Sequence, residues 1–200
     1  MSPRDYAILA QEAYSAAPDI GKEDSASRAI VRTTASGLCV AFPGTDNADG
    51  WSADFDAIPV QVQGMGDVHR GFWHSWEAIA PAVLAQIGDK PVTLVGHSLG
   101  AALAIMAAAT LTLAGKPPIA VYGFEPPRVS PDICIRTVLS KVPVHLYKNG
   151  LDIVPDVPLG WNHAALLTHI GTPALPFPNV QDHSIARVIA ALTATQPVTA

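Results

Sequence analysis

The feature that most constrains the fold is an alternation of short apolar strands with helices in the second half of the chain. Strands are expected at residues 92–95, 119–124 and 144–147, and the segments between them, 99–114 and 132–139, have the composition of helices. Such alternation is typical of βαβ units, which close with right-handed crossovers into a parallel sheet covered on both faces. The sequence therefore predicts an α/β fold with a mostly parallel central sheet and helices on both faces.

The rest of the chain extends this sheet and its helical layers. The apolar patterns predict an amphipathic helix at the N-terminus, hairpin strands at 28–34 and 38–42, a helix at 75–87, a short strand at 168–171 and a helix at 183–193. Residues 152–180 are rich in Pro and Gly and are expected to be mainly loop. The 200 residues can bury one core and leave little length for a second, so a single domain over 1–200 is predicted.

Charge and cysteine content argue against several classes of function. The net charge is −5 and the Lys and Arg residues are scattered, so no nucleic-acid partner is expected. Cys39 and Cys134 lie among apolar neighbours and are expected to be buried, reduced thiols. The cysteines and the seven histidines lack zinc-type spacing, so no metal site is expected.

The N-terminal residues give an expectation for the cellular location of the protein. Residues 1–12 mix acidic and apolar side chains and lack the unbroken apolar stretch of a secretory signal, so a cytoplasmic location is expected. Residues 91–115 carry no charge, but Gly96-His97-Ser98-Leu99-Gly100 divides them into a strand, a turn and a helix. This division argues against a membrane span.

The same five residues form a G-x-S-x-G pattern, which alone is a weak signal because chance matches are common. Its context is stronger, because a buried-strand sequence precedes it and a strong helix-forming sequence follows it. A strand, a sharp turn and a helix are the geometry of a nucleophile elbow, in which the two glycines avoid collisions with neighbouring backbone. Ser98 is therefore the candidate nucleophile, and the alternative is that Ser98 only caps the helix.

A serine hydroxyl needs a histidine to accept its proton and a carboxylate to orient that histidine. Asp152 follows the last long strand and is the preferred acid, with Asp156 as the alternative. His183, where the proline-rich loop meets the terminal helix, is the preferred base. Of the other downstream histidines, His169 fits a half-buried sheet residue and His163 a wall of the pocket.

Acyl transfer also needs two donors that face the developing oxyanion. One is the backbone N–H of Leu99, the residue after the nucleophile. The second is expected from Phe42-Pro43-Gly44-Thr45, where an early strand ends in a glycine turn and Thr45 offers an N–H and a hydroxyl. The alternative is an ordinary turn in which the threonine caps its own backbone.

These motifs, taken in order, resemble the fungal-lipase-like family, also called class 3 lipases. The similarity runs from about Arg28 to the end of the chain and rests on Phe42-Pro43-Gly44-Thr45, Trp51, Asp54, Val68-His69-Arg70-Gly71-Phe72, the G-x-S-x-G pattern, Gly123-Phe124-Glu125-Pro126-Pro127-Arg128-Val129, Asp152-Ile153-Val154-Pro155 and Asp182-His183. The resemblance implies an α/β-hydrolase fold, triacylglycerol or simpler ester substrates, no cofactor, the triad Ser98, Asp152 and His183, and Thr45 as an oxyanion residue.

The chain departs from this family in two residues and in length. Pro43 stands where the family usually has Arg, and Glu125 replaces a small or amide residue. The family's lid is expected to be reduced to residues 46–59, which form either an amphipathic flap or a fixed surface loop. Trp51 and Phe55 of this segment, together with His97, are expected to border the substrate.

The sequence therefore predicts a carboxylic ester hydrolase, a lipase or esterase, that forms an acyl-enzyme on Ser98. Its partners would be a small-molecule or lipid ester and, transiently, a lipid surface, with no protein partner implied. One alternative keeps the triad but transfers the acyl group to an alcohol or amine, or cleaves an amide. Another, motivated by Pro43 and Glu125, is a binding module that has lost activity.

Overall fold

The computed structural model describes residues 1–45, 57–175 and 181–194, and a seven-stranded sheet lies at its centre. The strand order is β1-β2-β3-β6-β7-β8-β9. The five parallel strands are β3 (Gly37–Phe42), β6 (Val92–His97), β7 (Ala120–Phe124), β8 (Val144–Asn149) and β9 (Leu167–Ile170). At one edge β2 (Arg28–Thr34) and β1 (Ile20–Gly21) pair antiparallel. This arrangement confirms the predicted α/β fold with a mostly parallel sheet.

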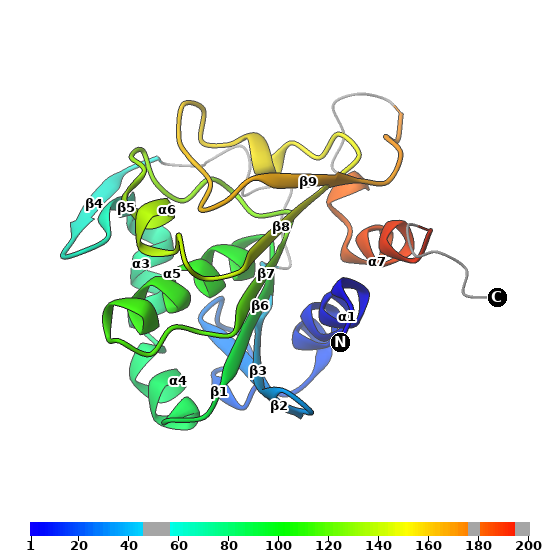
Figure 1. Ribbon diagram of the computed structural model, residues 1–200. Coiled ribbons are helices and arrows are strands. Elements are labelled where there is room, and N and C mark those ends of the chain that lie inside the picture. The colour runs from blue at the N-terminus through cyan, green and yellow to red at the C-terminus, as the bar shows by residue number, and fades with distance from the viewer. Residues whose placement is uncertain (46–56, 176–180, 195–200) are drawn as a thin grey trace.

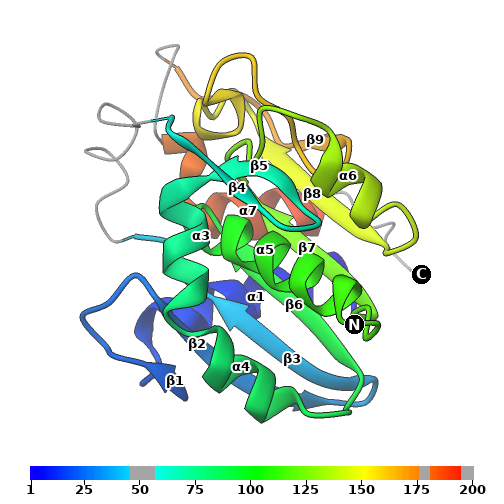
Figure 2. The ribbon, with the colours of Figure 1, turned by 90° about the vertical axis from the view of Figure 1, so that its left-hand side faces the viewer.

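Helices cover both faces of the sheet (Figures 1 and 2). One face carries α1 (Pro3–Ser15) and α7 (Ile185–Ala194), which pack against each other, and the other carries α3 (Arg70–Glu77), α4 (Ala80–Ile87), α5 (Leu99–Leu113) and α6 (Cys134–Val138). The buried apolar side chains accordingly divide into two clusters, one on each side of the sheet. The first and last helices of the chain thus share one layer.

The uncharged stretch noted in the sequence becomes β6 and α5. All residues of β6 are buried, and α5 is buried almost all round because it lies between the sheet and α3. Its alanines allow this close packing, since a small side chain lets the helix backbone approach the strands. In the described part of the chain, none of the helices is both long enough and apolar enough to cross a bilayer.

The structure differs from the sequence prediction between residues 57 and 87. The helix expected at 75–87 is two helices, α3 and α4, separated at Ala78 and Ile79. Pro81 explains the break, because proline is compatible with the first turn of a helix but not with its interior. A hairpin of β4 (Pro59–Val62) and β5 (Gly66–His69) precedes α3 and was not predicted.

The two thiols lie in different environments. Cys39 is buried in β3, and burial raises its pKa to about 12, so it is an inert structural thiol as expected. Cys134 is exposed, which contradicts the expectation of a buried thiol. The reason is that α6 is a short surface helix whose buried side chain is Ile135, while its apolar neighbour Ile133 is itself exposed.

Candidate active site

Ser98 occupies the turn between β6 and α5 with a left-handed backbone conformation, φ 56°. Its side chain makes no capping hydrogen bond to α5, so the alternative that Ser98 only caps this helix does not hold. The flanking glycines are sterically required. A Cβ on Gly96 would lie 2.1 Å from the carbonyl oxygen of Gly100, and a Cβ on Gly100 would lie 2.1 Å from that of Phe42. The local sequence therefore produces the strained turn predicted for a nucleophile elbow.

His183 and Asp152 lie together at the carboxyl ends of the parallel strands. His183 Nδ1 is 2.6 Å from Asp152 Oδ2, and the Asp152 side chain is fully buried. Asp152 Oδ1 accepts a hydrogen bond from the Val154 N–H at 3.1 Å. Burial alone would raise the pKa of Asp152, but the hydrogen bonds with His183 and Glu125 outweigh it and hold the pKa below its usual value. Asp152 is therefore ionised, and His183 carries its proton on Nδ1.

The other ring nitrogen of His183 is free. His183 Nε2 and Ser98 Oγ are both buried, and neither has a hydrogen-bond partner among the described residues, so the bond between them that a triad uses is not formed in this structure. His97, which precedes Ser98 in the chain, connects the elbow to His183, because its Nε2 donates to the His183 carbonyl oxygen at 2.8 Å. The rings of His97 and His183 are 4.7 Å apart between centroids. Catalytic hydrogen bonds are often long without substrate, so this geometry is compatible with a nucleophile and a base.

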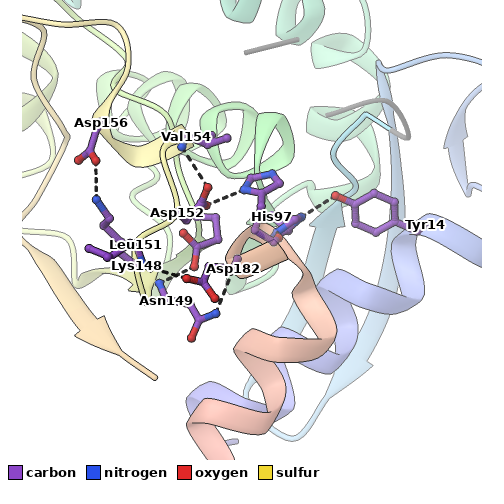
Figure 3. A network of polar contacts seen from close by, with 11 residues as sticks. Tyr14, His97, Lys148, Asn149, Leu151, Asp152, Val154, Asp156 and Asp182 are labelled. Atoms are coloured by element: carbon purple, nitrogen blue, oxygen red, sulfur yellow. Dashed lines mark hydrogen bonds and ion pairs between the residues drawn. The ribbon is translucent and has the colours of Figure 1, made fainter. Parts of the chain in front are cut away.

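His97, which is expected to border the substrate, is buried, and both of its ring nitrogens form hydrogen bonds with the protein. Burial lowers the pKa of His97 to about 3, so the ring is neutral. Because Nε2 donates to His183, Nδ1 must accept the hydrogen bond from the Tyr14 hydroxyl, which is 2.6 Å away (Figure 3). Both nitrogens are thus engaged by the protein. Tyr14 comes from α1, and the sequence analysis did not single it out.

Asp182 fixes the loop that carries His183 to the loop that carries Asp152. Its buried carboxylate accepts the Leu151 N–H at 3.1 Å, and its backbone oxygen accepts the side-chain amide of Asn149 at 2.9 Å (Figure 3). The carboxylate also accepts the Ala174 N–H at 3.0 Å. In the sequence, Asp182 stood out only as the neighbour of His183 in the last motif of the family resemblance. These partners lie far from Asp182 in the chain, so no local pattern could have revealed them.

The loop after β3 lies against the elbow. A Cβ on Gly44 would be 3.0 Å from Ser98 Cβ and 2.3 Å from the Tyr14 hydroxyl, so only a glycine allows this approach. The next residue, Thr45, has a buried hydroxyl that finds no hydrogen-bond partner within residues 1–45, 57–175 and 181–194. Leu99 is the first residue of α5, where backbone N–H groups have no partner within the helix. Two candidate donors for an oxyanion therefore flank the turn.

The competing residues lie elsewhere. Asp156 forms an ion pair with Lys148 at 2.6 Å and is half exposed. His163 hydrogen-bonds the Pro155 carbonyl oxygen at 2.8 Å, and burial lowers its pKa to about 4. His169 is exposed on β9 rather than half-buried. Trp51, Phe55 and most of the predicted lid at 46–59 lie outside the described residues.

One group of side chains is close enough to resemble a metal site. A carboxylate oxygen of Glu125, one of Asp152 and a ring nitrogen of His183 all lie within 4.8 Å of one another. A zinc ion, however, holds its ligand atoms at about 2.0–2.2 Å, which places tetrahedral ligands roughly 3 Å or more from each other. The 2.6 Å contact between Asp152 and His183 leaves no room for such an ion. The three residues are instead a hydrogen-bonded cluster.

Comparison with known proteins gives a consistent set of relatives. The profile of the family described as "Lipase (class 3)" matches residues 39–161. Secreted mono- and diacylglycerol lipase A of Penicillium cyclopium is 30% identical over 146 residues, which cover 68% of this chain and 48% of the relative. The chain thus spans about half the length of the curated relatives it matches. The native Rhizomucor miehei lipase propeptide complex superposes with a TM-score of 0.67 and 24% identity, and the match covers 84% of this chain and 67% of that one.

The relatives contradict the expected cytoplasmic location. Besides the Penicillium enzyme, a lipase of Fusarium solani that is 30% identical over 142 residues, 64% of this chain and 42% of the relative, is also named as secreted. The expectation rested on a missing apolar segment at the N-terminus. That absence carries no information about where the folded protein works, so the expectation was wrong.

Proposed function

Because this chain belongs to the class 3 lipase family, we propose that it is a serine hydrolase that cleaves carboxylic esters. Ser98 is the nucleophile, His183 the base, and Asp152 the acid that orients His183. The observation that carries the proposal is the state of the His183 ring. Its Nδ1 is bound to a buried carboxylate, while its Nε2 and the Ser98 hydroxyl are both buried without a hydrogen-bond partner among the described residues.

The reaction proceeds through an acyl-enzyme. His183 Nε2 takes the proton of Ser98 as Oγ attacks the ester carbonyl carbon, and Asp152 stabilises the resulting imidazolium. The tetrahedral intermediate places its negative oxygen between the Leu99 N–H and the donors of Thr45. As the intermediate collapses, His183 returns the proton to the departing alcohol. A water molecule then attacks the acyl-serine in the same way, with His183 again as the base, and releases the carboxylic acid. No cofactor is required.

The substrate class follows from the relatives. Two of them are named for mono- and diacylglycerols, and we infer that this chain also accepts acylglycerols at a lipid surface. We further infer that it works outside the cell and that residues 1–200 form a single catalytic domain. Acyl transfer and amide cleavage would use the same triad, so product analysis with an added alcohol or an amide substrate separates them from hydrolysis.

Active-site labelling tests the nucleophile. A fluorophosphonate probe is expected to label the wild-type protein but not Ser98→Ala, and p-nitrophenyl esters of short and medium chain length are expected to be turned over only by the wild type. No labelling and no turnover by the wild type would leave only the inactive binding module.

A pair of histidine variants tests the base. His183→Ala is expected to lower kcat/KM by about 10⁴-fold or more, because the triad acts as a unit. His169→Ala, on the exposed side of β9, serves as the control and should retain most activity. A strong loss in His169→Ala alone would overturn the choice of His183.

A further inference from the structure

Glu125 is a buried acid in a conformation that a glycine would adopt more easily. It directly follows β7, its relative exposure is 0%, and its φ is 50°. Among the described non-glycine residues, positive φ occurs only at Ser98 and Glu125. At Ser98 the strained backbone presents the hydroxyl. Glu125, where the family usually has a small or amide residue, also has a strained backbone, and we therefore ask which contacts its side chain makes.

The Glu125 carboxyl lies against the acid of the proposed triad. One oxygen, Oε1, accepts the Asn149 N–H at 2.5 Å, and a carboxyl oxygen of Glu125 lies within 4.8 Å of a carboxyl oxygen of Asp152. The other oxygen, Oε2, is buried and accepts no hydrogen bond from an N–H or hydroxyl group in the part of the chain that the structure describes. Two carboxyl groups can share a hydrogen bond only if one of them keeps its proton. Because Glu125 Oε2 accepts no hydrogen bond from the described N–H and hydroxyl groups, Oε2 is the atom that carries this proton.

The surroundings decide which carboxyl is protonated. Asp152 faces His183 and the Val154 N–H, and these favour its ionised form. Burial, followed by the hydrogen bond and the charge of Asp152, raises the pKa of Glu125 well above its usual range, and the opposing effects of Asn149 and Lys148 do not cancel this. Asp152 is therefore the carboxylate and Glu125 the neutral acid.

The nearby cations already have partners. Lys148 pairs with Asp156 at 2.6 Å, and Arg187 pairs with Asp182 at 3.2 Å. The neighbouring ring of His97 is neutral, and His183 is shared with Asp152. A second negative charge at Glu125 would thus be poorly compensated by the described residues around it.

We propose that Glu125 is a positioning residue of this site, which stays protonated at neutral pH and donates its Oε2–H to Asp152. One negative charge is then held by two carboxyl groups, and the donated hydrogen bond fixes the Asp152 carboxylate against His183. The inference rests on the proposed function for its catalytic meaning. Ionisation of Glu125 at alkaline pH removes the donor and adds a repelling charge, so it sets an alkaline limit on activity.

Two variants of similar size separate the donor from the charge. Glu125→Gln keeps a donor toward Asp152 but cannot ionise, whereas Glu125→Leu removes both. In Glu125→Leu, Asp152 becomes more basic and stabilises the imidazolium of His183 more strongly. The acidic limb of the kcat/KM profile should therefore move to higher pH, and kcat/KM should fall by about tenfold.

The pH profile of kcat/KM on a soluble p-nitrophenyl ester is the first measurement. For Glu125→Gln we expect the acidic limb of the wild type, rescue of most of the activity lost in Glu125→Leu, and an alkaline limb displaced upward by about one pH unit or more. A purely structural role would lower activity in both variants without moving either limb. Coinciding limbs in all three proteins would overturn the proposal.

An infrared measurement tests the proton without turnover. The difference spectrum of wild type minus Glu125→Gln at neutral pH should contain the C=O stretching band of a protonated carboxylic acid, shifted in D₂O. Absence of this band while esters are still hydrolysed overturns the inference and leaves the proposed function intact. Presence of the band without turnover or labelling overturns the proposed function instead.

Discussion

A buried neutral acid makes stability depend on pH in a direction that can be worked out. The pKa of Glu125 is raised in the folded state, so its contribution to stability is fully present below the unfolded pKa of about 4.3 and is lost as pH rises toward the folded value. Wild-type protein should therefore lose stability relative to Glu125→Gln as pH rises above about 4.3, by up to about 1.4 kcal/mol per pH unit.

Urea unfolding of both proteins across a series of pH values measures this difference. Glu77→Gln, which removes an exposed carboxyl at the end of α3, is the matched control and should follow the wild type. A free-energy difference between wild type and Glu125→Gln that is the same at every pH would show that Glu125 ionises normally.

At the residue scale, the sequence predicted which residues carry the chemistry, but it did not predict the contacts that hold them in place. Asp152 and His183 could be chosen because a triad needs those residue types in a known order, and the structure brings them together. Asp182 and Tyr14 could not be chosen, because their partners are remote in the chain and a buried hydroxyl or carboxylate has no sequence pattern of its own. Glu125 was noted as a departure, but its place against Asp152 required the fold.

At the scale of elements, the elbow depends on the close approach of α5 to β3. Gly100→Ala should destabilise the protein by more than about 3 kcal/mol, because the new Cβ would meet the backbone of Phe42, which cannot move without disturbing the sheet. Gly115→Ala, beyond the end of α5, is the matched control. It has a φ of 76° but nothing within 4 Å of its Cβ, so it should cost only about 1–2 kcal/mol.

Equilibrium unfolding in urea measures both glycine variants, and a Gly100→Ala protein that does not fold agrees with the expectation. If Gly100→Ala were as stable as Gly115→Ala, the close approach of α5 to β3 would not be a strict requirement of the elbow.

Helices and strands with a regular apolar pattern could be predicted from the sequence. Elements that depend on an irregular pattern or on a single proline could not. The β6-α5-β7 unit follows from mainly apolar runs of the right length without a charged residue, because burial on both faces excludes charges. The first strand of the hairpin, β4, begins with a proline and alternates between exposed and half-buried residues, so its sequence resembles a loop. The break between α3 and α4 depends on one proline within an otherwise continuous helical pattern.

At the scale of the whole molecule, the site is completed by the two ends of the chain. Tyr14 lies near the end of α1, His183 immediately precedes α7, and these two helices pack together on one face of the sheet (Figure 1). The hydrogen bonds of His97 to Tyr14 and to His183 connect this layer to the elbow. The layer of α1 and α7 therefore cannot separate from the sheet without displacing the proposed base.

A substitution that weakens the packing of α1 and α7 should therefore abolish activity at the temperature at which this layer separates from the sheet. Leu192 is a buried residue of α7 in the cluster shared with α1, and Leu192→Ala should cost about 2–4 kcal/mol through loss of apolar burial and a cavity. Thr193→Ala, at the exposed neighbouring position, removes the hydrogen bond from Arg4 and the one to the Ile189 carbonyl oxygen, both at the surface, and should cost less than about 1 kcal/mol. Hydrogen exchange of α7 and residual ester hydrolysis are measured over one temperature series. In Leu192→Ala, exchange of the α7 amides and loss of ester hydrolysis should occur at the same temperature, which is lower than in the wild type, because opening of α7 removes His183 from Asp152. Activity that persists after the amides of α7 have exchanged would show that the site does not depend on this layer.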